Sequence, residues 1–129
     1  MRVFSGKAKG IVLKTPEGML TRPTADRVKE ALFSIINFDI PGANVLDLFG
    51  GSGQLALEAL SRGAEFAVIN DASREAANII KENAQKTKLF DRCVILTKDY
   101  KAYLKGTKEK FDIIFLDPPY DTNMLAEAM

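Results

Sequence analysis

Apolar residues follow two different spacings from residue 45 to the end of the chain. Four short apolar runs have the length and composition of β-strands, at residues 45–48, 66–69, 93–96 and 111–116. Between them, apolar residues recur every three or four positions, as on one face of a helix, at residues 55–60, 76–84 and 100–104. Ser73 can cap the second of these helices. This strand–helix alternation predicts an α/β fold with a doubly wound parallel sheet and right-handed crossovers. The run 111–116 is apolar enough to predict a strand buried on both faces.

The N-terminal part of the chain follows a different pattern. Residues 1–15 mix short β-prone runs with glycines, which predicts a hairpin or an extended arm. Thr24 can cap a helix that follows it, and Pro41-Gly42 would end that helix. Its apolar residues share one face, which we expect to be buried: Val28, Ala31, Leu32, Ile35 and Ile36.

Size and composition indicate one soluble globular domain. The chain has 129 residues, of which 47% are hydrophobic and 27% charged. We expect a single domain over residues 1–129, with an arm at 1–23 and a cofactor-binding core at 24–129. Because open sheets commonly have about five or six strands, four strands suggest that C-terminal strands are missing and that the chain is truncated.

Missing residue types exclude several kinds of site. The sequence has no histidine and a single cysteine, Cys93. A Ser-His-Asp triad, a Cys-His pair, an imidazole or zinc-type metal site and an intrachain disulfide are therefore excluded, and we expect no metal. No apolar run approaches the roughly 18 residues of a membrane span, and the N-terminus lacks the apolar segment of a signal peptide. We therefore expect a cytoplasmic protein that does not enter a membrane.

Basic residues are concentrated near the N-terminus. Residues 1–30 contain seven basic and three acidic side chains, a net charge of +4, whereas the other 99 residues carry −3. A basic arm on a mildly acidic body suits contact with a polyanion, and Lys7, Lys9, Arg22 and Arg27 are the candidate contacts. The alternative is an ordinary solvated surface segment, in which Arg22 and Arg27 pair with nearby acids.

A glycine-rich loop lies between the first strand and the following helix. Glycines at 50, 51 and 53, around Ser52, allow positive φ angles and let a ligand approach the backbone and the free N–H groups of the helix. Asp71 closes the next strand, where an acid can accept hydrogen bonds from both ribose hydroxyls. The pair fits an adenosine-containing cofactor. Residues 51–56 also match G-x-G-x-x-A, so a nicotinamide cofactor remains an alternative, as does a plain strand–helix turn.

Two further acids refine the choice of cofactor. Asp47, in the first strand, would repel a pyrophosphate but attract an ammonium group, which favours S-adenosylmethionine over a dinucleotide; it could instead bond loop amides. Asp99 follows the third strand and would reach the adenine amine with Tyr100 beside it. A helix N-cap is an equal or better interpretation of Asp99.

The most specific motif is Asp117-Pro118-Pro119-Tyr120, at the end of the fourth strand. The two prolines remove N–H donors and stiffen the chain, which leaves the Asp117 carboxylate and the Pro118 carbonyl as acceptors. Two acceptors can hold the hydrogens of an exocyclic amine on a base, while the ring of Tyr120 stacks on that base. The alternative is a strand-ending turn with a chance acid and tyrosine.

Three segments together resemble the bacterial small-subunit ribosomal RNA guanine-N2 methyltransferase family. They are the motif at residues 22–33, the loop at 47–53 and the tetrapeptide at 117–120, and the likeness extends from Arg2 to the chain end. It implies a class I S-adenosylmethionine-dependent methyltransferase fold, which is Rossmann-like. It also implies methyl transfer to a guanine amine, with ribosomal RNA or the small ribosomal subunit as partner. We expect a monomer.

The motifs, the charge distribution and the resemblance together suggest roles for particular residues of this sequence. Cofactor binding falls to Asp47, Phe49, Gly50, Gly51, Ser52, Gly53, Asp71, Asp99 and Tyr100. The target base falls to Asp117, Pro118, Pro119 and Tyr120. RNA contact falls to Lys7, Lys9, Arg22, Thr24 and Arg27.

The chain departs from the family pattern at a few positions. Gly50 replaces a common alanine, which we expect to be harmless. Asp71 is one methylene shorter than the usual glutamate, so its ribose contact is expected to be looser, and Ser73 replaces an acid. Other functions stay open at this point: an NAD-type oxidoreductase, a methyltransferase acting on an amine of DNA or protein, and a non-catalytic RNA-binding fragment.

Overall fold

The computed structural model describes residues 2–15, 23–107 and 110–116. Its centre is a parallel sheet in the order β3-β2-β1-β4, which confirms the predicted α/β class. The strands are β1 Asn44–Asp47, β2 Phe66–Asn70, β3 Cys93–Leu96 and β4 Ile113–Phe115. The chain winds outward from β1 through β2 to β3 and then crosses back to β4. The switch point of the sheet therefore lies between β1 and β4.

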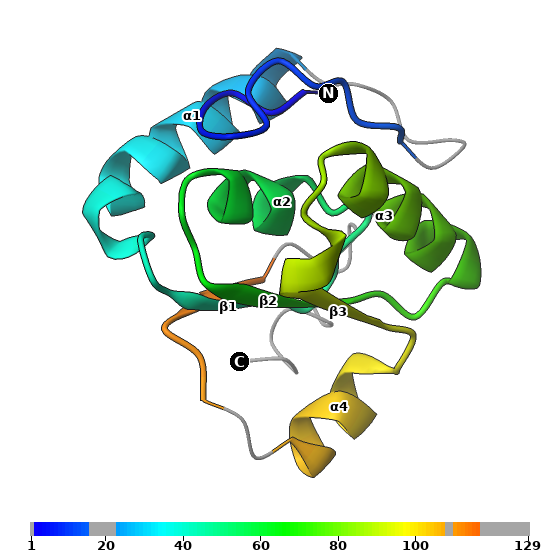
Figure 1. The fold of residues 1–129 in the computed structure, drawn as a ribbon. Coiled ribbons are helices and arrows are strands. Elements are labelled where there is room, and N and C mark those ends of the chain that lie inside the picture. Colours follow the sequence, from blue (N-terminus) through cyan, green and yellow to red (C-terminus); the bar gives the residue numbers. More distant parts are fainter. Residues whose placement is uncertain (1, 16–22, 108–109, 117–129) are drawn as a thin grey trace.

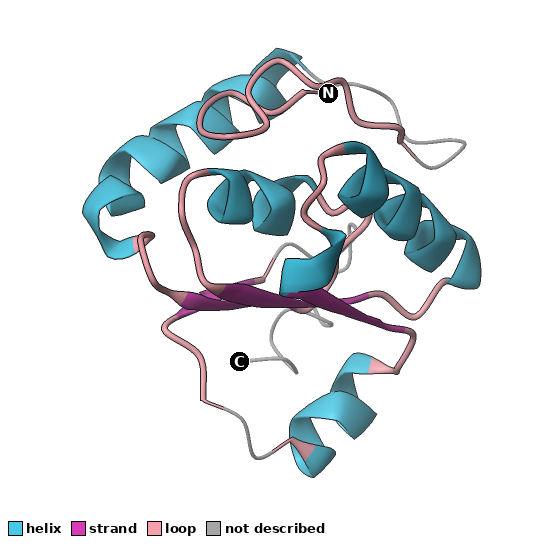
Figure 2. Ribbon diagram, viewed as in Figure 1, coloured by secondary structure: helices cyan, strands magenta, loops and turns pink. Residues whose placement is uncertain are grey.

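Helices cover both faces of this sheet (Figures 1 and 2). On one face lie α1 Pro23–Ile36, α2 Gln54–Ser61 and α3 Arg74–Lys86, and on the other lies α4 Tyr100–Gly106. Single 3₁₀ turns, Asn37–Asp39 and Phe90–Arg92, follow α1 and precede β3. In the part of the chain that the structure describes, none of the helices has the length and apolar character needed to span a membrane.

The sheet separates two apolar clusters, as the alternation of side chains along a strand requires. Val45 and Ile69 face α2 and α3, where they join the larger cluster with Leu57. Leu46 and Val68 face the opposite side, where the smaller cluster includes Tyr100 and Tyr103 of α4.

The N-terminal arm, residues 2–15, forms the outermost layer above α2 and α3 (Figure 1). It is hairpin-like, as predicted, although only one antiparallel bridge, Arg2 to Val12, closes it. Gly6 adopts a φ of 86°, and a Cβ there would overlap the carbonyl oxygen of Ser61. The arm therefore lies directly on the last turn of α2, and every residue of that helix from Ala56 to Ser61 is buried.

The predicted apolar face of α1 is only partly correct: Leu32 and Ile36 pack against the core, whereas other members of that face do not. Val28 is 66% exposed and Ile35 is 79% exposed, whereas Lys29 and Phe33, four residues apart, are buried. The helix turns this face inward because Lys29 meets a buried carboxylate of α2 and Phe33 packs against Phe115, with ring centroids 5.8 Å apart. Helix α1 also begins at Pro23, which is favoured at the first helical position, so Thr24 lies inside the first turn and does not precede it as a cap.

The prediction that residues 111–116 form a strand buried on both faces is also wrong. The strand is shorter, at Ile113–Phe115, and Ile114 is 53% exposed while Phe115 is buried. The reason is position: among the described strands β4 pairs only with β1 and lies at the edge of the sheet.

Candidate cofactor site

The carboxyl ends of the parallel strands bring the predicted cofactor residues to one edge of the sheet. Asp47 ends β1, Asp71 follows β2, and Asp99 comes three residues after β3. Pairing of Asp47 with Ile69 and of Asn70 with Leu96 keeps these ends level. In open α/β sheets, ligands bind at this edge beside the switch point.

The glycine loop forms a tight turn between β1 and α2. Gly50 donates its N–H to the carbonyl of Asn70 at 2.7 Å, and Gly53 donates to the carbonyl of Gly50 at 2.8 Å. Gly53 occupies the N-cap of α2 in the left-handed region, with φ 82°. An L side chain is strained in that conformation, so glycine is required for this turn. The loop therefore leads the chain into α2 with its backbone close to the strand ends.

Asp71 ties this loop to the end of β2. One carboxylate oxygen accepts the N–H of Gly51 at 2.9 Å, and the other accepts the N–H of Ser73 at 2.9 Å. Ser73 in turn caps α3, as predicted, by accepting the N–H of Ala76. Each carboxylate oxygen has a second lone pair, so Asp71 can hold the loop and still accept a bond from a ligand hydroxyl.

Asp47 is almost fully buried, with 1% of its surface exposed. It ends the central strand that leads into the glycine loop, so its charge lies beneath that loop. From Asp47 to Gln54 the sequence contains no basic residue. A segment with this charge suits a cation better than a pyrophosphate.

Asn70 is a site residue that the sequence analysis missed. It is 1% exposed, and its amide nitrogen donates to the carbonyls of Leu48 at 3.3 Å and Lys98 at 2.9 Å, while its oxygen accepts the N–H of Lys98 at 3.0 Å. Asn70 thus fixes the exits of β1 and β3 to the end of β2. A polar residue at the end of an apolar strand was the available signal, but its partners could not be read from the sequence.

The third strand end carries Asp99 and Tyr100. Asp99 accepts the N–H groups of Lys101 and Ala102 at 3.1 and 3.3 Å and so caps α4, the alternative considered for it above. The ring of Tyr100 lies 5.3 Å from that of Phe49, between ring centroids. The glycine loop and the start of α4 therefore meet through two aromatic rings. An adenine contact for Asp99 stays a prediction.

Gly50 is more constrained than the sequence suggested. A Cβ at this position would lie 2.7 Å from Cγ2 of Ile69 and 2.9 Å from Cδ1 of Ile80. Both isoleucine side chains would have to move to admit an alanine, so the packing of this chain favours glycine at position 50.

The predicted RNA-contacting residues lie in the arm, in α1 or outside the described residues. Lys7, Lys9 and Arg27 are exposed. The N–H of Lys7 donates to the carbonyl of Ser61 at 2.9 Å, at the end of α2 opposite the glycine loop. Thr24 lies in α1, whereas some of the predicted residues fall outside the described residues: Arg22, Asp117, Pro118, Pro119 and Tyr120.

A buried charge cluster holds the arm and α1 against α2, and the sequence analysis missed it too. Glu58 is fully buried, and one of its oxygens accepts from Lys29 Nζ at 3.1 Å and from the Phe4 N–H at 2.8 Å. The other oxygen accepts from Arg62 Nε at 2.9 Å and from the Ser5 N–H at 3.1 Å. Burial lowers the pKa of Lys29, and the carboxylate of Glu58 opposes that shift.

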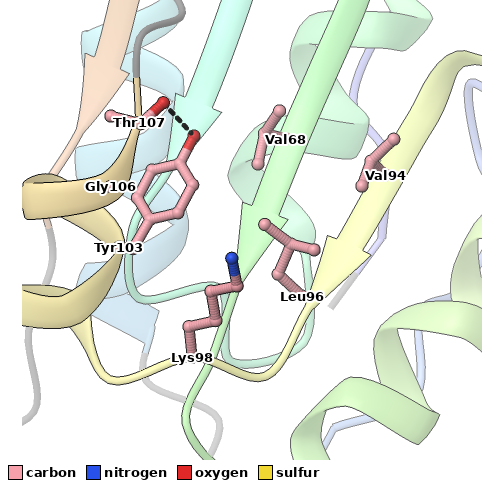
Figure 3. Close-up of a pocket in the computed structure, with 7 residues that line it drawn as sticks. All are labelled: Val68, Val94, Leu96, Lys98, Tyr103, Gly106 and Thr107. Carbon is pink, nitrogen blue, oxygen red and sulfur yellow. Dashed lines mark hydrogen bonds between the residues drawn. The ribbon is translucent and has the colours of Figure 1, made fainter.

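A separate hollow of about 440 Å³ opens on the α4 face of the sheet (Figure 3). Val68, Val94 and Leu96 of the strands form its apolar wall, and Lys98 extends toward it. On the α4 side, the hydroxyl of Thr107 donates to that of Tyr103 at 3.4 Å. Among the described residues that line it there is no predicted cofactor residue. This hollow is therefore distinct from the loop site.

Comparison with known proteins places the chain among methyltransferases. The model of the family described as Conserved hypothetical protein 95 matches residues 1–129. The chain is 41% identical to YlbH of Bacillus subtilis over 97% of its own length and 70% of that protein. It is 34% identical to the Ribosomal RNA small subunit methyltransferase D of Haemophilus influenzae, covering all of this chain and 68% of that protein. For the Escherichia coli protein of the same name the values are 33% identity and 65% coverage, so the chain spans about two thirds of these relatives.

Solved structures agree with the fold. The structure of yhhF from Escherichia coli aligns with a TM-score of 0.88 at 30% identity, over 99% of this chain and 68% of that one. A SAM-dependent O-methyltransferase from Thermotoga maritima aligns with a TM-score of 0.61 at 23% identity, over 80% and 37% of the two chains, which shows the fold alone. The chain has the class I methyltransferase fold, and it belongs to the Conserved hypothetical protein 95 family, that of the ribosomal RNA small subunit methyltransferases D.

Proposed function

We propose that the protein transfers a methyl group from S-adenosylmethionine to the exocyclic amine of a guanine in small-subunit ribosomal RNA. One observation carries the cofactor assignment: a glycine loop lies at the switch point of the sheet between two acids, buried Asp47 and loop-bound Asp71. The family supports methyl transfer to ribosomal RNA, because relatives with that name match the whole chain.

The chemistry of the described residues fits this cofactor. S-adenosylmethionine supplies an electrophilic methyl group on a sulfonium, and it carries an ammonium and a ribose but no phosphate. Asp47 would accept from the ammonium, and Asp71 would accept from the ribose hydroxyls. The adenine would lie with Phe49, Asp99 and Tyr100, while the backbone of residues 50–53 closes the site.

The remaining roles fall to the tetrapeptide that follows β4. In the sheet, Phe115 pairs with Asp47, so the chain leaves β4 at the edge that carries the glycine loop. This supports a role for Asp117 and the Pro118 carbonyl in accepting the two hydrogens of the guanine amine, with the ring of Tyr120 stacked on the base. Catalysis then rests on positioning and on polarisation of the amine. Asp117 need not be a strong base, since the proton can leave after the methyl group has been transferred.

Titration calorimetry with S-adenosylmethionine and with NAD tests the cofactor assignment. We expect the first to bind and the second not to bind. Asp71→Asn keeps one oxygen acceptor but loses the charge, so it should weaken the affinity roughly 10- to 100-fold, the scale of a charge-assisted hydrogen bond. Asp91→Asn is the matched control, because this exposed acid lies in the 3₁₀ turn before β3. This variant should bind S-adenosylmethionine with the affinity of the unmodified protein.

Other outcomes would point to other functions. Binding of NAD in place of S-adenosylmethionine would indicate an oxidoreductase, and binding of neither would indicate an RNA-binding fragment. Mass spectrometry of methylated small-subunit ribosomal RNA tests the finer claim. We expect the added methyl group on a guanine, and a methyl group on another base would overturn that assignment.

A further inference from the structure

Asn83 connects three segments that are distant in the sequence. It lies in α3 with 1% of its surface exposed. Its carboxamide oxygen accepts the N–H of Lys14 at 2.8 Å, and its amide nitrogen donates to the carbonyls of Lys14 and Ser52, both at 2.8 Å. Lys14 lies near the end of the arm, and Ser52 lies in the glycine loop. One buried side chain therefore holds both the arm and the loop.

Only a carboxamide can make this set of bonds. It offers two N–H donors and one acceptor oxygen, so it pairs with both the N–H and the carbonyl of Lys14 and still has a donor for Ser52. An aspartate has the same shape but no donor, and it would place a negative charge beside two carbonyl oxygens. Asn83 and its bond to Ser52 are buried, so water cannot replace that bond.

The arm has a second attachment at the opposite end of α2. There, Glu58 and Ser61 bind backbone groups of residues 4–8. Asn83 instead fixes Lys14 beside the glycine loop, and the neighbouring Glu82 pairs with the Lys14 ammonium at 3.4 Å. That ion pair is mostly exposed, so it adds little. Leu13, next to Lys14, is buried in the core, and the amide of Asn83 supplies the hydrogen bonds that hold the backbone of Lys14.

Resting on the function proposed above, we propose that Asn83 is a positioning residue that links RNA binding by the arm to cofactor binding by the loop. The switching element is the end of the arm, which is either docked on Asn83 or released. A bound cofactor orders the loop and keeps the Ser52 carbonyl in place, which favours the docked state. RNA that is bound to the docked arm also favours the docked state. Each ligand then raises the affinity for the other by the same factor.

The test measures this factor in the complete protein. The dissociation constant of a small-subunit ribosomal RNA transcript is determined with and without saturating S-adenosylhomocysteine. We expect the cofactor product to tighten RNA binding at least about 5-fold, the lower end of typical couplings between sites. In Asn83→Asp the factor should fall to within about 2-fold of unity. A purely structural role for Asn83 would lower both affinities but leave their ratio unchanged, which would overturn the proposal.

Two control variants separate coupling from stability. Glu82→Gln removes the exposed ion pair with Lys14 and keeps the amide contacts. Thr87→Val removes buried hydroxyl bonds to the carbonyls of Asn83 and Ala84 in the same helix, without touching the arm or the loop. Both variants should retain the coupling factor of the unmodified protein. If the coupling is lost in Thr87→Val, any weakening of α3 abolishes it, and the role proposed for Asn83 is overturned.

A measurement on the unmodified protein keeps the proposal testable if Asn83→Asp does not fold. Amide hydrogen exchange at Lys14 should slow at least about 5-fold when S-adenosylhomocysteine binds, because this N–H donates to Asn83. Unchanged exchange in a protein that binds the ligand would overturn the coupling alone. Failure to bind the ligand at all would overturn the proposed function and the coupling with it.

Discussion

Removing the carboxylate of Glu58 should destabilise the protein more than any other single change in the charge cluster of Lys29, Glu58 and Arg62. Glu58 is 0% exposed in its side chain and Lys29 is 2% exposed, so neither charge is solvated by water. Glu58→Ala leaves the Lys29 ammonium buried with the carbonyl of Arg2, at 3.2 Å, as a remaining acceptor. It also takes away the acceptor of the Phe4 and Ser5 N–H groups.

The magnitudes follow from what each variant leaves behind. Breaking a buried ion pair from one side costs about 3–5 kcal/mol, because an uncompensated charge stays buried. Lys29→Met should cost less, about 1–2 kcal/mol, because Glu58 keeps Arg62 and two backbone N–H groups as partners. The double variant Lys29→Met/Glu58→Ala contains no buried unpaired ammonium. It should therefore be more stable than Glu58→Ala alone, by about 1–2 kcal/mol.

Urea unfolding followed by circular dichroism measures these differences. Glu82→Ala is the control, since its ion pair with Lys14 is 59–62% exposed and its loss should change stability by less than about 0.5 kcal/mol. If the double variant is as unstable as the sum of the two single variants, Lys29 and Glu58 do not interact and the account of this cluster is wrong.

Two further predictions concern a thiol and the arm. Burial, with Asp91 nearby, raises the pKa of Cys93 from 9.0 to about 11, so at pH 8 its reaction with a disulfide reagent should be roughly 100-fold slower in the folded protein than in urea. The rate should keep rising tenfold per pH unit beyond pH 9, and equal rates in both states would contradict the shift. Changing Lys7 and Lys9 together to Gln should make the log–log salt slope of RNA binding shallower by about 1.5. An unchanged slope, equal to that of the Lys105→Gln control on α4, would show that the arm is an ordinary solvated surface segment.

Element types were predictable where local pattern and turn residues agreed. The strand at 93–96 matches β3, and Ser73 caps α3 as its sequence position indicated. The glycine loop and Asp71 also meet as expected, since parallel strand ends must share an edge of the sheet. These features depend on the spacing of residues along the chain, which can be read directly from the sequence.

Contacts between distant polar residues could not be predicted in this way. Helical spacing favoured an apolar face for α1, yet the structure buries Lys29, because Glu58, 29 positions further along the chain, lies opposite it in α2. Glu58 interrupts an apolar run, and this was the one available signal that it is buried. Asn83 gave none, since a buried asparagine and an exposed one look the same in a sequence until the carbonyl partners are known.

The central claim is tested most directly by single-turnover methylation of small-subunit ribosomal RNA with labelled S-adenosylmethionine, using the complete protein. We expect Asp117→Ala to slow methyl transfer by at least about 100-fold, the scale of a lost transition-state contact, while cofactor affinity stays within about 2-fold. Asp117→Asn should be milder, because the amide oxygen still accepts a hydrogen bond from the base amine. Transfer at the unmodified rate by Asp117→Ala would contradict the assignment of this protein's catalytic site.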